Sequence, residues 1–417
     1  MPIPLTPAAC SGLLSFKLIL MDVKDRLYFI FRRKTNTLSF IPQIDGLRFV
    51  AIAMVVLYHV NIFVTNKVPF DFTRPAPDYW WMFQFLDSDR KGVLLFFVIS
   101  GFILALPFAR AARKEGKPVE MKRYFLRRLT RLEPPYFLTM IASYLGIILL
   151  KGHGFAELLN RTFTGLFPSL AVSLVYMHNV IFPHNLSVNP VAWSLEIEIQ
   201  FYILMPLLAV VFKFTARTRW LLLATVMAGF IFFQHLLQPG VYTLFNYIQY
   251  FLLGFLLVDV YLSNYKPKLF PGASIIIGIL CLAFIGYADL RQFNYQEYVF
   301  VPVIFIFYVL ALTDGFWKRV FSFRLLTVIG GMCYSIYLLH YNIIAVVGNR
   351  TIFFNVTQNY PLAYLWHAAI LLPIILLVSG VFYLLIERPC MDKDWPKKLW
   401  QYVNRLVGRN VAEQPGI

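Results

Sequence analysis

Residues 44–60 read IDGLRFVAIAMVVLYHV, an apolar run of helix length that carries Arg48 and His59. An α-helix turns by about 100° per residue, so these two residues lie only about 20° apart around the helix and about 16 Å apart along it. One helix face therefore presents a guanidinium near a membrane surface and an imidazole deep in the bilayer. Polar side chains at that depth usually face the bundle interior and mark a functional path. A snorkelling arginine and a core histidine would explain each residue alone, so the functional interpretation depends on the pair.

The composition is that of a membrane protein. Of the 417 residues, 59% are hydrophobic and 14% are charged, whereas a soluble domain has about 25% charged residues. Apolar runs long enough to cross a bilayer core of about 30 Å recur along almost the whole chain. We therefore predict an all-α, polytopic membrane bundle of about ten transmembrane helices. The predicted spans are residues 45–64, 91–109, 132–150, 191–212, 220–237, 241–262, 271–288, 298–313, 325–348 and 362–386.

The distribution of basic residues predicts the orientation of the bundle. The net charge of +17 invites a nucleic-acid interpretation, but with ten spans and a cytoplasmic N-terminus, 30 of the 38 Lys and Arg residues face the cytoplasm. If residues 166–182 also spanned, this bias would be lost, so we predict a re-entrant or interfacial segment there. We expect a cytoplasmic basic lead-in at 1–41 instead of a cleaved signal, a transmembrane domain at 42–390, and a cytoplasmic tail at 391–417. The four cysteines have no metal-ligand spacing.

Two further motifs lie in or beside the early spans. Ser100 and Gly101 fall in the middle of the second span, where a small pair permits close helix approach. Arg127, Arg128 and Arg131 precede a Pro-Pro pair, and the last two share a helix face. Grouped arginines suit bidentate capture of phosphate. Ordinary positive-inside topology would also explain their number, though not their spacing.

Later motifs supply carboxylates and a second histidine. Glu196 and Glu198 follow Trp193, and because they are two positions apart we expect at most one to face the bundle core. A carboxylate inside the membrane needs a partner, either catalytic or in a structural ion pair. His340 lies in a helix predicted to run outward, at a depth similar to that of His59. We interpret IERP at 386–389 as a simple cytoplasmic anchor.

Six motifs in order resemble the membrane acyltransferase family 3, multi-pass O-acyltransferases of cell-surface glycans. They are the Arg-x10-His of Arg48 and His59, FFVISGF at 96–102, RRLTRLEPPY at 127–136, WSLEIEIQFY at 193–202, YSIYLLH at 334–340 and IERP at 386–389. The motifs cover roughly residues 42–390. The glutamate of the family's WSLxxE pattern falls on Glu198.

The resemblance implies a bacterial enzyme of the cytoplasmic membrane that transfers an acyl group, in particular acetyl, from cytoplasmic acetyl-CoA to a hydroxyl of a cell-envelope polysaccharide or similar acceptor. It implies catalytic roles for His59, Arg48 and Glu198, a donor site at Arg127, Arg128 and Arg131, and supporting roles for Ser100, Gly101, Trp193 and His340. These three groups are the candidate site residues. His59 would act as a general base or as an acyl-carrying nucleophile.

We expect neither a metal nor a permanently bound cofactor, and no nucleic-acid partner. No appended esterase-like domain, which some members carry, is expected, so the bundle or a separate partner would complete the transfer. A transporter or flippase with an intramembrane Arg, His and Glu path is the alternative function. A scaffold without catalytic activity is a third interpretation, which His59 and the arginine group disfavour.

Overall fold

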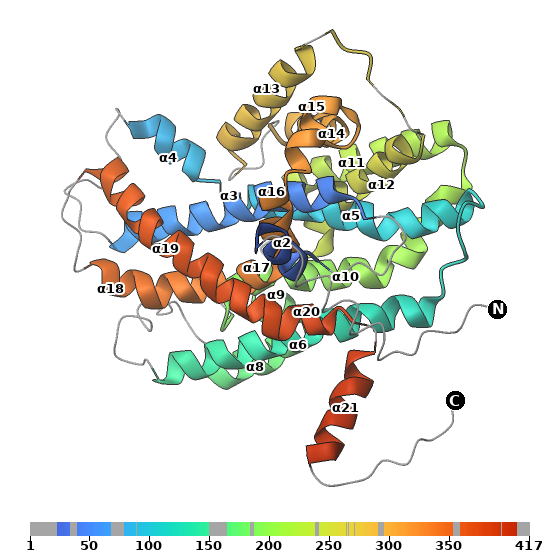
Figure 1. The fold of residues 1–417 in the computed structure, drawn as a ribbon. Coiled ribbons are helices and arrows are strands. Elements are labelled where there is room, and N and C mark those ends of the chain that lie inside the picture. The colour runs from blue at the N-terminus through green and yellow to red at the C-terminus, as the bar shows by residue number, and fades with distance from the viewer. Residues whose placement is uncertain are drawn as a thin grey trace.

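Helices account for all the regular secondary structure in the residues that the structure, a computed structural model, describes. These residues are 23–33, 40–67, 79–88, 90–149, 165–183, 187–237, 242–263, 265, 267–270, 272–290, 296–352, 359–392 and 394–406. No strand occurs among them, which confirms the all-α prediction. Figure 1 shows that the long helices run roughly alongside one another as one bundle.

Seven helices are long and apolar enough to cross a membrane. They are α3 (Pro42–Lys67), α5 (Lys91–Ala112), α6 (Met121–Leu149), α10 (Trp193–Leu208) with the short η2 (Pro190–Ala192) and η3 (Ala209–Lys213) on either side, α11 (Ala216–Leu237), α14 (Gln296–Thr313), and α19 (Tyr360–Phe382) with η7 (Tyr383–Glu387) and α20 (Arg388–Cys390). The chain is thus a multi-pass membrane protein.

Three other predicted spans are helical but depart from a simple crossing. Between 324 and 351 the chain forms a pair of helical segments bent by 68°, from α16 (Arg324–Gly331) into α17 (Cys333–Ile343) and its continuation, which would make an eighth span. The helices α12 (Ile248–Leu262) and α13 (Ala273–Tyr287) are apolar but shorter. The count of ten spans and the cytoplasmic position of both termini stay predictions.

The segment predicted not to span forms two short helices. α8 (Leu166–Leu174) has nine residues and α9 (His178–Ile181) has four. At 1.5 Å per residue neither is long enough to cross a bilayer. α8 packs beside α6 (Figure 1).

α6 differs from its prediction because it begins at Met121 and continues through Pro134 and Pro135. Pro134 has no N–H to donate to the carbonyl of Thr130, four residues earlier. That carbonyl instead accepts a hydrogen bond of 2.8 Å from Trp395 Nε1. The tail helix α21 (Trp395–Leu406) is thereby attached to α6 at its first residue and then leaves the bundle (Figure 1).

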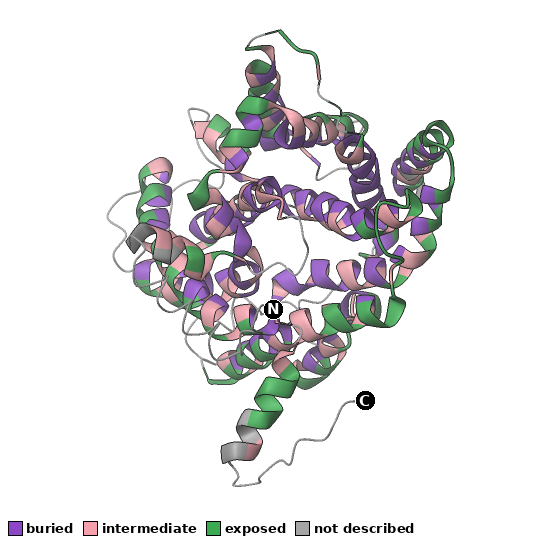
Figure 2. Ribbon diagram, turned by 45° about the vertical axis from the view of Figure 1, so that its right-hand side comes forward, coloured by how far each residue is buried: buried purple, intermediate pink, exposed green. Residues whose placement is uncertain are grey.

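A close crossing of α5 and α12 forms the centre of the core. A Cβ atom at Gly101 would lie 2.1 Å from the Phe251 carbonyl oxygen, and one at Gly254 would lie 2.3 Å from the Phe102 nitrogen. Both helices are buried along most of their length, and Figure 2 shows buried residues along the central helices and exposed ones on the helix nearest the C-terminus. The close approach predicted from Ser100 and Gly101 is confirmed.

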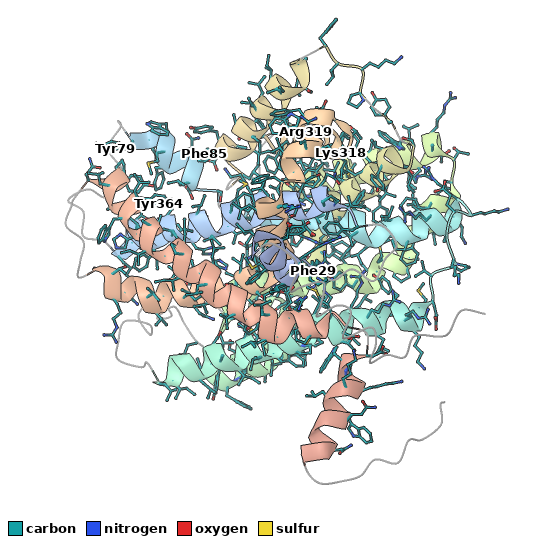
Figure 3. The ribbon with its side chains drawn as sticks, in the orientation of Figure 1. Phe29, Tyr79, Phe85, Lys318, Arg319 and Tyr364 are labelled. Carbon is teal, nitrogen blue, oxygen red and sulfur yellow. The ribbon has the colours of Figure 1, made fainter. Side chains whose placement is uncertain are left out.

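The N-terminal helix α2 (Val23–Phe31) packs against α16. Arg324 of α16 forms an ion pair with Asp25, and its guanidinium lies 5.2 Å from the centre of the Tyr28 ring. Figure 3 shows Phe29 of this helix in front of the middle of the bundle, whereas Tyr79 and Tyr364 lie toward its left edge. The lead-in therefore includes a helix that contacts the transmembrane domain. Residues 1–22 and 34–39 of the lead-in, and 407–417 of the tail, lie outside the described residues.

Candidate functional site

The structure brings the two histidines of the predicted site together. His59 of α3 and His340 of α17 are 281 positions apart in sequence, yet His340 Nε2 lies 3.2 Å from His59 Nδ1. Their ring centres are 4.9 Å apart in an edge-to-face arrangement. His340 is fully buried and His59 is partly buried. The Tyr341 ring is edge-on to His59 at 5.5 Å.

Hydrogen-bond partners assign the tautomers of this pair. His340 Nδ1 faces the carbonyl oxygens of Ile336 and Tyr337 at 3.0 and 2.8 Å, so it carries the proton and donates to them. His340 Nε2 is then an acceptor. His59 Nδ1 faces the Val55 carbonyl oxygen at 2.8 Å as well as His340 Nε2, so it also carries a proton that these two acceptors share. The basic lone pair of His59 is consequently on Nε2.

This arrangement favours a proton acceptor at His59. When Nε2 of His59 takes a proton, the ring becomes an imidazolium whose Nδ1–H donates to a neutral imidazole and a carbonyl. Both acceptors stabilise the cation without themselves being charged. His340 is therefore a positioning residue that holds the His59 ring and its tautomer.

Tyr337 connects the histidine pair to the start of α10. Its ring centre is 5.9 Å from that of His340, and its hydroxyl donates to the Val191 carbonyl oxygen at 2.7 Å. The Ser194 hydroxyl lies 2.6 Å from the Tyr337 hydroxyl and donates to it. Trp193, the preceding residue, is partly buried and is 5.6 Å from each of the Tyr242 and Tyr247 ring centres.

Glu198 faces α5. Its Oε1 accepts a hydrogen bond of 2.7 Å from the Ser100 hydroxyl and another from the Tyr202 hydroxyl, one turn along α10. Ser100 and Gly101 therefore have different partners, since the serine contacts α10 while the glycine contacts α12. Glu198 also interacts electrostatically with Tyr337, whose ring lies near that of His340.

Glu196 is buried and Glu198 is partly buried, so the expectation that at most one of these glutamates faces the bundle core is wrong. Its carboxylate accepts backbone N–H bonds from His178 and Asn179 at 3.2 and 2.8 Å, at the beginning of α9. The two glutamates do point to opposite sides, but α10 lies between α5 and the α8–α9 segment, so both sides are covered. His178 is buried, with its Nε2 3.1 Å from the Ser169 hydroxyl. His184 lies outside the described residues.

We expect Glu198→Gln to affect the transfer rate and Glu196→Gln to affect thermal stability. Glu198→Gln should lower the transfer rate by about tenfold to a hundredfold, because a charged hydrogen bond contributes about 1.5–3 kcal/mol. Glu196→Gln should instead lower thermal stability, because a neutral amide holds the α9 backbone more weakly. Transfer rates and melting temperatures of both purified variants would separate these effects. Equal rates in the two variants would remove Glu198 from the site.

The arginine group lies on the part of α6 that precedes the Pro-Pro pair. The Arg128 guanidinium lies 4.9 Å from the ring centres of both Tyr124 and Tyr202. Tyr202 in turn donates to Glu198, which also accepts from Ser100, so Arg128 is connected to Ser100 through these side chains. The Nε atoms of Arg128 and Arg131 are buried without a hydrogen-bond partner. Arg127 is exposed.

Two buried carboxylates accompany the arginines. Arg48 forms an ion pair of 2.5 Å with Asp45. Glu387 accepts hydrogen bonds from the backbone N–H and hydroxyl of Ser335 at 3.1 and 2.5 Å, near the beginning of α17, and interacts with Arg131. The interpretation of IERP as a simple anchor is therefore wrong, because Glu387 is 1% exposed and holds α17 in place.

Arg48 is not adjacent to His59 in the structure. The two lie eleven positions apart on α3, or about 16 Å, and Arg48 belongs to the carboxylate and arginine group. Asp45 and Tyr337 are site neighbours that sequence reasoning missed, although a carboxylate three positions before Arg48 was a usable signal. No cluster of three or more potential metal ligands occurs in the described part of the chain.

Comparison with known proteins decides the family. A family model described as an acyltransferase domain matches residues 41–384. The chain belongs to this acyltransferase family. The match contains His59 and His340, both glutamates of α10 and the arginines of α6.

Curated proteins similar to this chain include several from Staphylococcus aureus. A provisionally named O-acetyltransferase of strain COL is 25% identical over 338 residues, which are 75% of this chain and 52% of the relative. A protein of strain NCTC 8325 named O-acetyltransferase OatA is 23% identical over 418 residues, 93% of this chain and 64% of the relative. The chain thus spans about half the length of the first relative. No solved structure matches.

Proposed function

We propose that this chain is a membrane O-acyltransferase that moves an acyl group, acetyl in particular, from cytoplasmic acyl-CoA to a hydroxyl of a glycan or glycan-like acceptor. The observation that carries the proposal is the His59–His340 contact within the bundle, with its basic nitrogen assigned to His59 Nε2. The family match and the O-acetyltransferase names of the relatives support the reaction class.

The charge distribution supports acyl-CoA as the donor. The phosphates of CoA are polyanionic, and buried guanidiniums with unused Nε donors at Arg128 and Arg131 suit them. The pantetheine arm is long enough in general to carry a thioester from an interfacial phosphate site into a bundle. Arg128, which lies over the Tyr202 ring, and Glu198, which accepts a hydrogen bond from Tyr202, would line the path from the phosphate site into the bundle.

The chemistry at His59 follows from its tautomer. As a general base, Nε2 takes the proton of the acceptor hydroxyl while that oxygen attacks the thioester carbonyl. The tetrahedral intermediate then expels the CoA thiolate, which receives the proton from the imidazolium. As a nucleophile, Nε2 would itself attack the thioester, release CoA, and pass the acyl group to the hydroxyl. Both routes yield free CoA and an acyl ester.

The experiment that tests the proposal supplies purified full-length protein with acetyl-CoA labelled in the acetyl group. We expect CoA thiol release, and transfer of label to lipid-linked or surface glycans added as acceptor. Mass analysis of surface polysaccharides with and without the gene would identify the acylated sugar. A transporter would move substrate across vesicles without releasing thiol, and that result would contradict the proposal.

A further inference from the structure

One arginine outside the family match belongs to the buried charge group. Arg33 follows α2 in the basic lead-in, and its side chain is only 11% exposed. The guanidinium lies 3.5 Å from Asp45 Oδ1 and interacts electrostatically with Arg131 and Glu387. Its Nε is buried without a hydrogen-bond partner. A basic residue that served topology alone would be exposed to water, as its neighbour Arg32 is.

Positive charge exceeds negative charge in this group. The three arginines Arg33, Arg48 and Arg131 gather around two buried carboxylates, Asp45 and Glu387. A buried charge without a counterion is costly, so a surplus of guanidinium in a partly dry site favours an anionic ligand. Phosphate is the anion that the planar guanidinium fork matches.

Neutralising Asp45 does not account for Arg33. Arg48 already forms a 2.5 Å ion pair with the same oxygen, Asp45 Oδ1, to which Arg33 makes the longer contact of 3.5 Å. Glu387 is likewise satisfied by the Ser335 backbone and hydroxyl, with Arg131 as its nearest charge. Arg33, Arg48 and Arg131 together therefore carry one positive charge more than Asp45 and Glu387 can neutralise.

The position of Arg33 is fixed by the N-terminal helix. α2 is held on α16 by the Arg324–Asp25 ion pair and by Arg324 over Tyr28. A Cβ atom added at Gly331, at the bend between α16 and α17, would lie 3.5 Å from the Arg33 Cβ and 3.7 Å from its backbone nitrogen, so the two residues are neighbours. The lead-in thus brings a guanidinium from outside the transmembrane domain to the same group as Arg131.

We propose that Arg33 binds a phosphate of the acyl-CoA donor, so that the N-terminal segment completes one wall of the donor site. The inference rests on the proposed function, because it assumes that the arginine group holds CoA. It adds a residue and a segment that the family match does not contain, and it assigns the lead-in a role in binding instead of in topology alone.

The test measures equilibrium binding of CoA, 3′-dephospho-CoA and pantetheine to the full-length protein in neutral phosphatidylcholine nanodiscs. We expect wild-type protein to prefer CoA to pantetheine. Arg33→Ala should weaken CoA binding by about tenfold to a hundredfold and leave pantetheine binding unchanged. Arg33→Lys should restore part of the CoA affinity, because a point charge lacks the fork. Arg32→Ala is the matched control: this neighbour is exposed and stacks on Phe40, so the variant should lose much less CoA affinity than Arg33→Ala, although Arg32 also interacts electrostatically with Asp45.

The outcomes separate this inference from the proposed function. If wild-type protein does not prefer CoA to pantetheine, the donor site fails and Arg33 fails with it. If wild-type protein and Arg131→Ala differ in CoA affinity while Arg33→Ala matches wild type, only the role of Arg33 is overturned. If Arg33→Ala differs from wild type only after phosphatidylglycerol is added to the nanodiscs, Arg33 binds a lipid headgroup and the proposal is overturned. Should Arg33→Ala fold poorly, as judged by its melting temperature without ligand, Arg33→Lys and Arg33→Gln provide the same comparison.

Discussion

Replacing His59 with alanine is expected to lower the rate of acyl transfer by about 10²–10⁴-fold, because the variant loses the nitrogen that takes the hydroxyl proton. Protein yield and CoA binding should persist, since the arginine group lies about 16 Å away along α3. His340→Ala should be milder, because His340 orients the ring through Nε2 and does not react. Transfer rates and CoA binding of the purified variants measure both effects.

A matched control for this experiment is His367→Ala. His367 is also a fully buried membrane histidine, but it lies on α19, with Nδ1 donating to the Ala363 carbonyl oxygen at 2.8 Å. We expect it to retain transfer activity. Label from acetyl-CoA that remains on wild-type protein but not on His59→Ala would favour the acyl-histidine route. A stably inserted His59→Ala with more than a tenth of the wild-type rate would show that His59 is structural.

Replacing Gly101 with alanine is expected to prevent stable assembly of the bundle. The added Cβ would lie 2.1 Å from the Phe251 carbonyl oxygen, and a backbone atom in a buried helix crossing cannot move aside as a flexible side chain can. Overpacking of a core costs about 1–3 kcal/mol and occasionally more. Separation of α5 from α12 would also shift Ser100 away from Glu198. We therefore expect a lower melting temperature and a reduced transfer rate together.

Gly229→Ala provides the comparison for this second prediction. Gly229 lies in α11, and a Cβ there would meet nothing within 4 Å. Alanine is also the better helix former, so this variant should be as stable as wild type or slightly more stable. Melting temperatures of the two variants in the same detergent would test the crossing. If Gly101→Ala melted like Gly229→Ala, the α5–α12 contact would be looser than the structure places it.

The sequence by itself determined the class of fold and much of the candidate site. Bilayer thickness imposes a minimum length on an apolar helix, so hydropathy alone located the long apolar helices, although it placed the start of α6 eleven residues too late. The same constraint makes intramembrane polar residues conspicuous, and for that reason His59, His340 and Glu198 could be selected without a structure. Helix geometry likewise predicted that Arg128 and Arg131 share a face, and that Glu196 and Glu198 point to opposite sides.

Only the tertiary structure decided which residues meet. The separation of 281 positions between His59 and His340 is closed by packing of α3 on α17, which no local periodicity encodes. The burial of Glu196 was not predicted, and Glu387 was interpreted as part of a simple anchor, because a sequence cannot show that α9 and the beginning of α17 cover these carboxylates with backbone N–H groups. Arg33 looked like ordinary topogenic charge for the same reason. Burial depends on contacts between distant segments, and a buried charged side chain needs a partner or a ligand, whereas an exposed one does not.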